Sequence, residues 1–236
     1  AAAFGTPAED LPARFDVSVG VRVDQLLAYS QHYPADVVLL GHRRNRSGKR
    51  SLAQRMAMLC PSSVWSVPDG VPCEIRSILA PVDFSSHSAD SLSVATEIAE
   101  KLSLSECHAL HVSFDPSIIR YDEHLDHLRS EELGAFRKFV DPVNTHGVSV
   151  SPIFEEASNV TQAILRTAAE RGSDLIVMST RGRSSAAAIL LGSETSQTLM
   201  ESPVPVLAVK HQGAALNLLQ ALIDPDLWRQ SSLHTN

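Results

Sequence analysis

The sequence predicts a doubly wound α/β fold with a mostly parallel five-stranded sheet, accompanied by a second, partial copy of the same unit. Short, continuous apolar runs such as residues 175–178 alternate with amphipathic helical segments. Such runs are typical of parallel strands that are buried on both faces. The second observation is that the chain repeats part of its own pattern, which indicates an internal duplication.

The repeat relates the beginning of the chain to its later part. A shift of 138 residues places Asp36 on Asp174, and a shift of 142 residues places Pro61 on Pro203. The first copy therefore has a loop that is four residues shorter. Because no counterpart of the unit's first strand precedes it, residues 1–70 would supply only the second half of a unit. Either the natural chain has lost the first half, or the sequence is a fragment.

Composition limits the class of protein. The chain has 236 residues, of which 44% are hydrophobic and 20% charged, with a formal net charge of −7. This charge argues against general nucleic-acid binding. The three cysteines form no CxxC pair, so neither a disulfide framework nor a zinc site is supported, and no other metal-ligand cluster is evident. Since no apolar run is long enough to span a bilayer, we expect a cytoplasmic protein without a membrane segment.

The beginning of the chain reads as follows. Residues 1–15 are small and aperiodic, which suggests a lead-in without regular structure. Residues 15–19 alternate apolar with polar side chains, as in a half-buried strand. Asp24 is expected to cap a helix that runs to about Tyr33. Residues 37–40 form a continuous apolar run, which predicts a buried strand.

Two further segments each have two interpretations. The run HRRNRSGKR from His42 to Arg50 contains five Lys or Arg residues. It is either a phosphate- or nucleic-acid-binding loop built on point charges and Arg forks, or a solvated surface loop. The C-terminal tail, residues 213–236, carries a short apolar helical stripe. This stripe either packs on the surface of a unit or binds a separate protein.

A complete unit is predicted over residues 74–212. Its first strand ends in Asp83, and Ser86 or Ser88 can cap the helix that follows. Ser158 or Asn159 can cap a later helix. The other elements, in order, are a strand at residues 108–112, a helix at 122–146, a strand at 148–154, the helix ending near Gly172 and a strand at 175–178.

The loop after residues 175–178 carries the candidate site. Gly182 and then Gly192 precede a helix over residues 194–201, with Ser193 as its predicted N-cap. The strand's carboxyl end and the helix's amino end would face the same space, where unpaired N–H groups and the helix dipole favour an anion such as phosphate. Both glycines could take positive φ and let the backbone approach phosphate oxygens. Two glycines ten residues apart are also common simply as turn residues.

This loop resembles the nucleotide loop of the universal stress protein family. The family pattern is Gly, two residues, Gly, nine residues, then Gly-Ser or Gly-Thr. Gly182, Gly192 and Ser193 match it, whereas Ser179 occupies the first glycine position and would weaken binding if that position needs positive φ. The run PVDFS around Asp83 resembles the family's first-strand motif. The resemblance covers residues 74–211 and, in part, 15–68, and it implies a Rossmann-like fold.

The resemblance also implies roles for individual residues. Asp83 would contact the ribose and Val112 the adenine of ATP or AMP. Gly182, Gly192 and Ser193 would surround the phosphates, which could carry Mg²⁺. Ser179 and Glu194 complete the predicted nucleotide-binding set.

The functional expectation is an adenine-nucleotide-binding regulatory protein of the stress response. An alternative is an interaction module of the same fold whose nucleotide site has decayed. The sequence contains no GxxxxGK[ST], GxGxxG, GxSxG or HExxH motif, so no catalytic residue is predicted. Weak ATP hydrolysis or self-phosphorylation, which some relatives show, is a third option.

The last strand suggests how the protein assembles. Pro205 lies in the segment from Val204 to Val209, and because proline has no N–H, this strand should start there or lie at a sheet edge. The equivalent segment runs from Ser62 to Val67. We expect these two strands to pair with each other as an intrachain pseudo-dimer, or either one to pair with a second molecule in a homodimer, as is common in the family.

Overall fold

The computed structural model describes residues 16–33, 35–42, 51–72, 74–113, 122–182 and 191–210, with backbone only for residues 42 and 122–129. The predicted lead-in, most of the basic loop and the predicted C-terminal helix lie outside these residues. Among the helices of the described part, none is long and apolar enough to cross a membrane.

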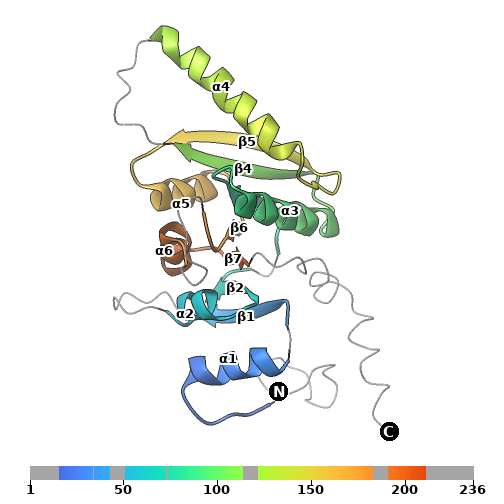
Figure 1. Cartoon of the computed structure of the whole chain (residues 1–236), viewed down its shortest axis with the longest axis vertical. Helices are drawn as coiled ribbons and strands as arrows, with labels where there is room; N and C mark the ends of the chain where they lie inside the picture. The colour runs from blue at the N-terminus through green and yellow to red at the C-terminus, as the bar shows by residue number, and fades with distance from the viewer. Residues whose placement is uncertain are drawn as a thin grey trace.

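The chain folds into one seven-stranded sheet with helices on both faces (Figure 1). The strands follow the order β1-β2-β7-β6-β3-β4-β5. The elements, in chain order, are α1 (Arg22–His32), β1 (Val37–His42), α2 (Leu52–Leu59), β2 (Ser63–Pro68), β3 (Ile78–Pro81), α3 (Ser86–Lys101), β4 (Glu106–Ser113), α4 (Asp122–Val140), β5 (Ser149–Glu156), α5 (Val160–Glu170), β6 (Leu175–Ser179), α6 (Ser193–Glu201) and β7 (Val206–Val209).

The strands β3 to β7 confirm the predicted five-stranded, doubly wound sheet. From β3 the chain continues to β4 and β5 on one side, whereas β6 and β7 lie on the other side. All of these neighbours pair in parallel. The strand order therefore reverses between β3 and β6, and in such sheets ligands bind at the carboxyl ends of the strands beside this switch point.

Each face of the sheet carries its own apolar core. On one face, α3 and α4 contribute buried side chains such as Leu92, Ile98 and Phe136. On the other face, α1, α2, α5 and α6 contribute Val23, Met56 and further apolar residues. Both cores include residues from β2 as well as from β3, β4, β6 and β7, so β2 extends the core of the five-stranded unit.

The strands β2 and β7 meet in an antiparallel pair, in which Trp65 lies opposite Leu207. For these two strands the sequence predicted exposed edges that would pair with each other or with a second molecule. In this chain they pair with each other. Pro205 directly precedes β7, and its carbonyl oxygen accepts a hydrogen bond from the Ile176 N–H at 2.9 Å. The order α1-β1-α2-β2 equals the order α5-β6-α6-β7, as a duplication would produce.

Several local predictions were wrong. Residues 16–19 form no strand, and Val17 and Val19 are 95% and 96% exposed. The first helix begins at Arg22 after Val21, so Asp24 lies in its first turn and is not its cap. The helix α4 ends at Val140, well short of residue 146.

The caps of the later helices also differ in part from the predictions. The N-cap of α3 is Ser85, whose hydroxyl oxygen accepts from the Ser88 N–H at 3.2 Å, so neither predicted cap is correct. The N-cap of α5 is Asn159, one of the two predicted residues. Gly172 follows this helix with a φ of 60°, which suits a residue without a Cβ.

Candidate functional site

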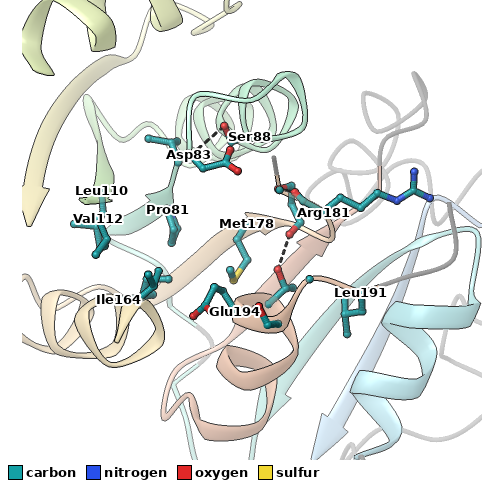
Figure 2. Close-up of a pocket in the computed structure, with 17 residues that line it drawn as sticks. Pro81, Asp83, Ser88, Leu110, Val112, Ile164, Met178, Arg181, Leu191 and Glu194 are labelled. Atoms are coloured by element: carbon teal, nitrogen blue, oxygen red, sulfur yellow. Dashed lines mark hydrogen bonds between the residues drawn. The ribbon is translucent and has the colours of Figure 1, made fainter. Parts of the chain in front are cut away.

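A cavity of about 410 Å³ opens at the carboxyl ends of β3 and β6, at the switch point of the sheet (Figure 2). All seven residues of the predicted nucleotide-binding set line it: Asp83, Val112, Ser179, Gly182, Gly192, Ser193 and Glu194. The structure thus brings together residues that are separated by up to 111 positions in the sequence. This convergence follows from the parallel topology, because the loops after parallel strands gather at one edge.

Asp83 follows β3 and is held by the first turn of α3. Its Oδ1 accepts hydrogen bonds from the Ser85 N–H at 3.1 Å and from the Ser85 hydroxyl at 2.5 Å. Its own N–H donates to Ser88 Oγ at 3.4 Å, as Figure 2 shows. These contacts orient the carboxylate toward the cavity before any ligand arrives.

The neighbouring Phe84 points to the other side of the chain. Its φ of 62° is unusual for a bulky residue and marks a sharp turn between β3 and α3. Its ring stacks on His111 with a centroid distance of 4.1 Å and packs against the core of the α3 and α4 face. His111 in turn contacts the Val82 carbonyl oxygen through Nδ1 at 2.9 Å. The turn therefore packs Phe84 against the core, partly buried, while Asp83 faces the cavity.

The two glycines serve purposes other than the predicted one. Neither Gly182 nor Gly192 has a positive φ, so the expected use of that conformation is wrong. A Cβ added to Gly182 would lie 2.7 Å from Asp83 Oδ2, which is too close for a side chain. The glycine at this position therefore allows the loop after β6 to approach the Asp83 carboxylate.

The start of α6 also differs from the prediction. The N-cap is Gly192, and Ser193 is the first helical residue. The Gly192 N–H donates to the Thr180 carbonyl oxygen at 2.8 Å, so this amide is already engaged. No acceptor within the described part of the chain takes the N–H groups of Ser193 and Glu194. These two amides are therefore among the donors available at this helix end.

Ser179, the departure from the family pattern, has no positive φ. Its hydroxyl donates to the Arg181 carbonyl oxygen. Its own carbonyl oxygen accepts from Thr195 Oγ1 at 2.7 Å. The residue thus connects the loop to the first turn of α6, and its side chain satisfies the loop's own backbone.

The remaining wall of the cavity is apolar. Val112 at the end of β4 lies beside side chains from α5, β4 and β6. These residues are Leu110, Val160, Ile164 and Met178, with Pro81 and Leu191 completing the surface. An apolar wall of this kind, with a few converging polar groups, is typical of small-molecule sites.

The cavity is lined by acidic and basic residues. Among the described lining residues, the acidic ones are Asp83 and Glu194 and the basic one is Arg181. The Arg181 side chain extends away from both carboxylates (Figure 2). Burial lowers the pKa of Lys210, and the positive charge of Arg181 lowers it further, so these two cations lie near each other.

Some lining residues were missed by the sequence analysis. Arg181 precedes Gly182 directly, so its place beside the loop could have been inferred. Val160 and Ile164 lie four residues apart on α5, and this spacing places them on one helix face. Thr161 reaches Glu194 across a gap of 33 residues, at 2.6 Å between Oγ1 and Oε2, and no local signal indicates this contact.

Comparisons with known proteins agree with this architecture. A universal stress protein from Archaeoglobus fulgidus has a TM-score of 0.58 at 24% identity, over 81% of this chain and 66% of its own. A universal stress protein structure from Pseudomonas aeruginosa has a TM-score of 0.59 at 18% identity, over 84% of this chain and 71% of its own. At these identities the likeness shows the shared fold. This chain spans 66% of the length of the Archaeoglobus protein.

A comparison with curated proteins gave no significant match. The model of the universal stress protein family, in contrast, matches residues 74–210, which include β3 to β7 and all the described residues that line the cavity. Because this match covers more than half of the 236 residues, the chain belongs to the universal stress protein family.

Proposed function

We propose that the cavity binds an adenine nucleotide, ATP or AMP, and that the protein acts as a nucleotide-responsive regulator of the stress response. The observation that carries this proposal is the convergence in one cavity of an apolar wall, the Asp83 carboxylate and the first turn of α6. A nucleotide needs these three surfaces for its base, its ribose and its phosphates. Membership of the family supports the same function.

The residues present fit the parts of such a ligand. The apolar surface at Val112 and Ile164 suits the faces and edge of adenine. Asp83, held by Ser85, can accept hydrogen bonds from ribose hydroxyl groups. The N–H groups of Ser193 and Glu194, together with the α6 dipole, can hold a phosphate, with Mg²⁺ offsetting further negative charge.

Nucleotide recovery tests this proposal. Freshly purified protein would be heat-denatured and the released small molecules identified by mass spectrometry. We expect ATP or AMP in amounts approaching one per chain, and an increase in melting temperature when either nucleotide is added to stripped protein. The Asp83→Asn variant should lose most of this increase, and the increase should be kept in Glu201→Gln, which changes a carboxylate outside the cavity.

A second candidate is an interaction module whose nucleotide site has decayed. Three features favour it. The Gly192 N–H already donates to the Thr180 carbonyl oxygen, and the Ser179 hydroxyl donates to the Arg181 carbonyl oxygen. Glu194 also places a carboxylate at the helix end. This candidate predicts that no nucleotide is recovered and that millimolar ATP or AMP leaves the melting temperature unchanged. Incubation with γ-labelled ATP would separately detect weak hydrolysis or self-phosphorylation.

We also propose the domain organisation inferred from the sequence. Residues 1–70 would be the second half of one unit and residues 74–212 a complete unit, arranged as a pseudo-dimer within the chain. The pairing of β2 with β7 supports this arrangement. Light scattering of the purified chain would distinguish it from a homodimer that uses the same edge.

A further inference from the structure

Glu194 places a carboxylate where the anionic part of a ligand would be expected. It lies in the first turn of α6, where unpaired N–H groups and the helix dipole attract negative charge. Its Oε2 accepts from Thr161 Oγ1 at 2.6 Å, and its Oε1 accepts from Ser193 Oγ at 3.3 Å. Because Thr161 is fully buried on α5, this contact holds the carboxylate at the cavity wall.

A second carboxylate lies across the cavity. Figure 2 shows Asp83 on the α3 side and Glu194 on the α6 side, with Met178 between them. The Arg181 side chain extends away from both carboxylates. A polyphosphate entering between β3 and α6 without a counter-ion would therefore meet the Glu194 carboxylate, a like charge, in a partly desolvated site.

We propose that Glu194 is a specificity-determining residue that makes the cavity select its adenine ligand by phosphate charge, accepting adenosine or AMP over metal-free ATP. This inference rests on the nucleotide-binding function proposed above. Each additional phosphate adds repulsion from the Glu194 carboxylate. A divalent cation would offset that repulsion, because carboxylate and phosphate oxygens are both ligands that Mg²⁺ prefers. ATP would therefore enter as its magnesium complex.

Calorimetric titration of the full chain with adenosine, AMP and ATP tests the proposal, each ligand being measured with EDTA and with Mg²⁺. In EDTA we expect wild type to bind AMP at least about tenfold more tightly than ATP, and Glu194→Gln to reduce this ratio by about tenfold. Mg²⁺ should move the wild-type ratio toward one and change the variant's ratio much less. Glu201→Gln, at the other end of the same helix, is the matched control and should behave as wild type.

The outcomes separate the two proposals. If wild type and Glu194→Gln both bind nucleotides with the same AMP-to-ATP ratio, the role of Glu194 is wrong while the binding function stands. If folded wild type binds none of the three ligands, both proposals are wrong. Should Glu194→Gln fail to fold, Thr161→Val removes the hydroxyl that holds the carboxylate. In EDTA, folded Thr161→Val should show a preference for AMP over ATP that is at least about threefold smaller than that of wild type. An unchanged preference would overturn the inference.

Discussion

Gln54 on α2 donates from its side-chain amide to the carbonyl oxygen of Ser196 on α6 at 2.9 Å and to its hydroxyl oxygen at 3.1 Å. The two residues are 142 positions apart, which is also the separation of Trp65 and Leu207 in the pairing of β2 with β7. A shift of 142 was the offset of the sequence repeat in this region. Residues at the same position in two copies of a unit contact each other where the copies meet on a twofold axis. Both contacts therefore support the inferred duplication.

The Gln54 contact should be worth a measurable part of the stability of the chain. Gln54 also completes the capping box of α2, in which its side chain accepts from the Ser51 N–H at 2.6 Å. Gln54→Ala should therefore lower the free energy of unfolding by about 2–3 kcal/mol, as the sum of a lost cap and a buried contact. Ser51→Ala removes the cap alone and should cost about 1 kcal/mol. Equal losses in urea titrations of the two variants would show that the contact with Ser196 contributes nothing.

Covering of β7 by β2 should control self-association. A fragment of residues 74–210 would expose the edge of β7, whose residues are fully buried in the chain. We expect light scattering to show that this fragment dimerises at micromolar concentrations, because the unpaired N–H and C=O groups of an exposed strand edge can pair with a second molecule. The whole chain should not use that edge. A fragment that stays monomeric at high concentration would contradict the prediction.

The approach of Gly182 to Asp83 gives a matched pair of glycine variants. Gly182→Ala would place a Cβ 2.7 Å from Asp83 Oδ2, so the carboxylate must move. We expect at least about tenfold weaker nucleotide binding with little change in melting temperature, since only a side-chain end is displaced. Gly192→Ala is the control, because its Cβ would meet its nearest neighbour, the Thr180 carbonyl oxygen, at an ordinary 3.5 Å. The prediction fails if both variants bind equally well.

Glu97 should make stability depend on pH. It is buried on α3, and burial raises its pKa above the ordinary value of 4.5, although the positive charge of His146 opposes this shift. A raised pKa in the folded state means that the stabilising contribution is complete below about pH 4.5 and is lost as the pH rises through the folded-state pKa. Glu97→Gln should therefore melt higher than wild type at pH 8 and equally at pH 4.

A gain of about 1 kcal/mol would appear as about 2–4 °C in a chain of this size. The exposed neighbour Glu100, which pairs with Lys101 at 3.6 Å, provides the control. Glu100→Gln should change the melting temperature little at either pH. The same difference between wild type and Glu97→Gln at both pH values would show that the carboxylate is not the cause.

The parallel unit was predictable because its signals are local. The apolar run at residues 175–178 becomes β6, and Asp83 lies just beyond β3 at the carboxyl edge, as expected. Sequence spacing placed Gly182, Gly192 and Ser193 in one loop and helix start, and parallel topology then brings that loop to the same edge as Asp83 and Val112. The rest of the predicted lining set, Val112 among it, came from the family resemblance.

Other features depend on contacts between distant residues, which no local pattern encodes. The Thr180 carbonyl oxygen accepts from the Gly192 N–H, so this amide is not available to an anion. The alternation of residues 16–19 suggested a strand, yet no neighbouring strand pairs with them among the described residues. Periodicity predicts which side chains prefer burial, whereas pairing requires a partner at the correct distance.

By itself, the sequence determined the α/β class, the strand that ends before Asp83 and the loop that begins α6, because apolar periodicity and turn residues act within a few positions. Only the tertiary structure decided that β2 covers β7, that Gly182 makes room for a carboxylate, and that Thr161 holds Glu194 at the cavity wall. Those arrangements arise from packing and hydrogen bonds between segments that meet only when the sheet is complete.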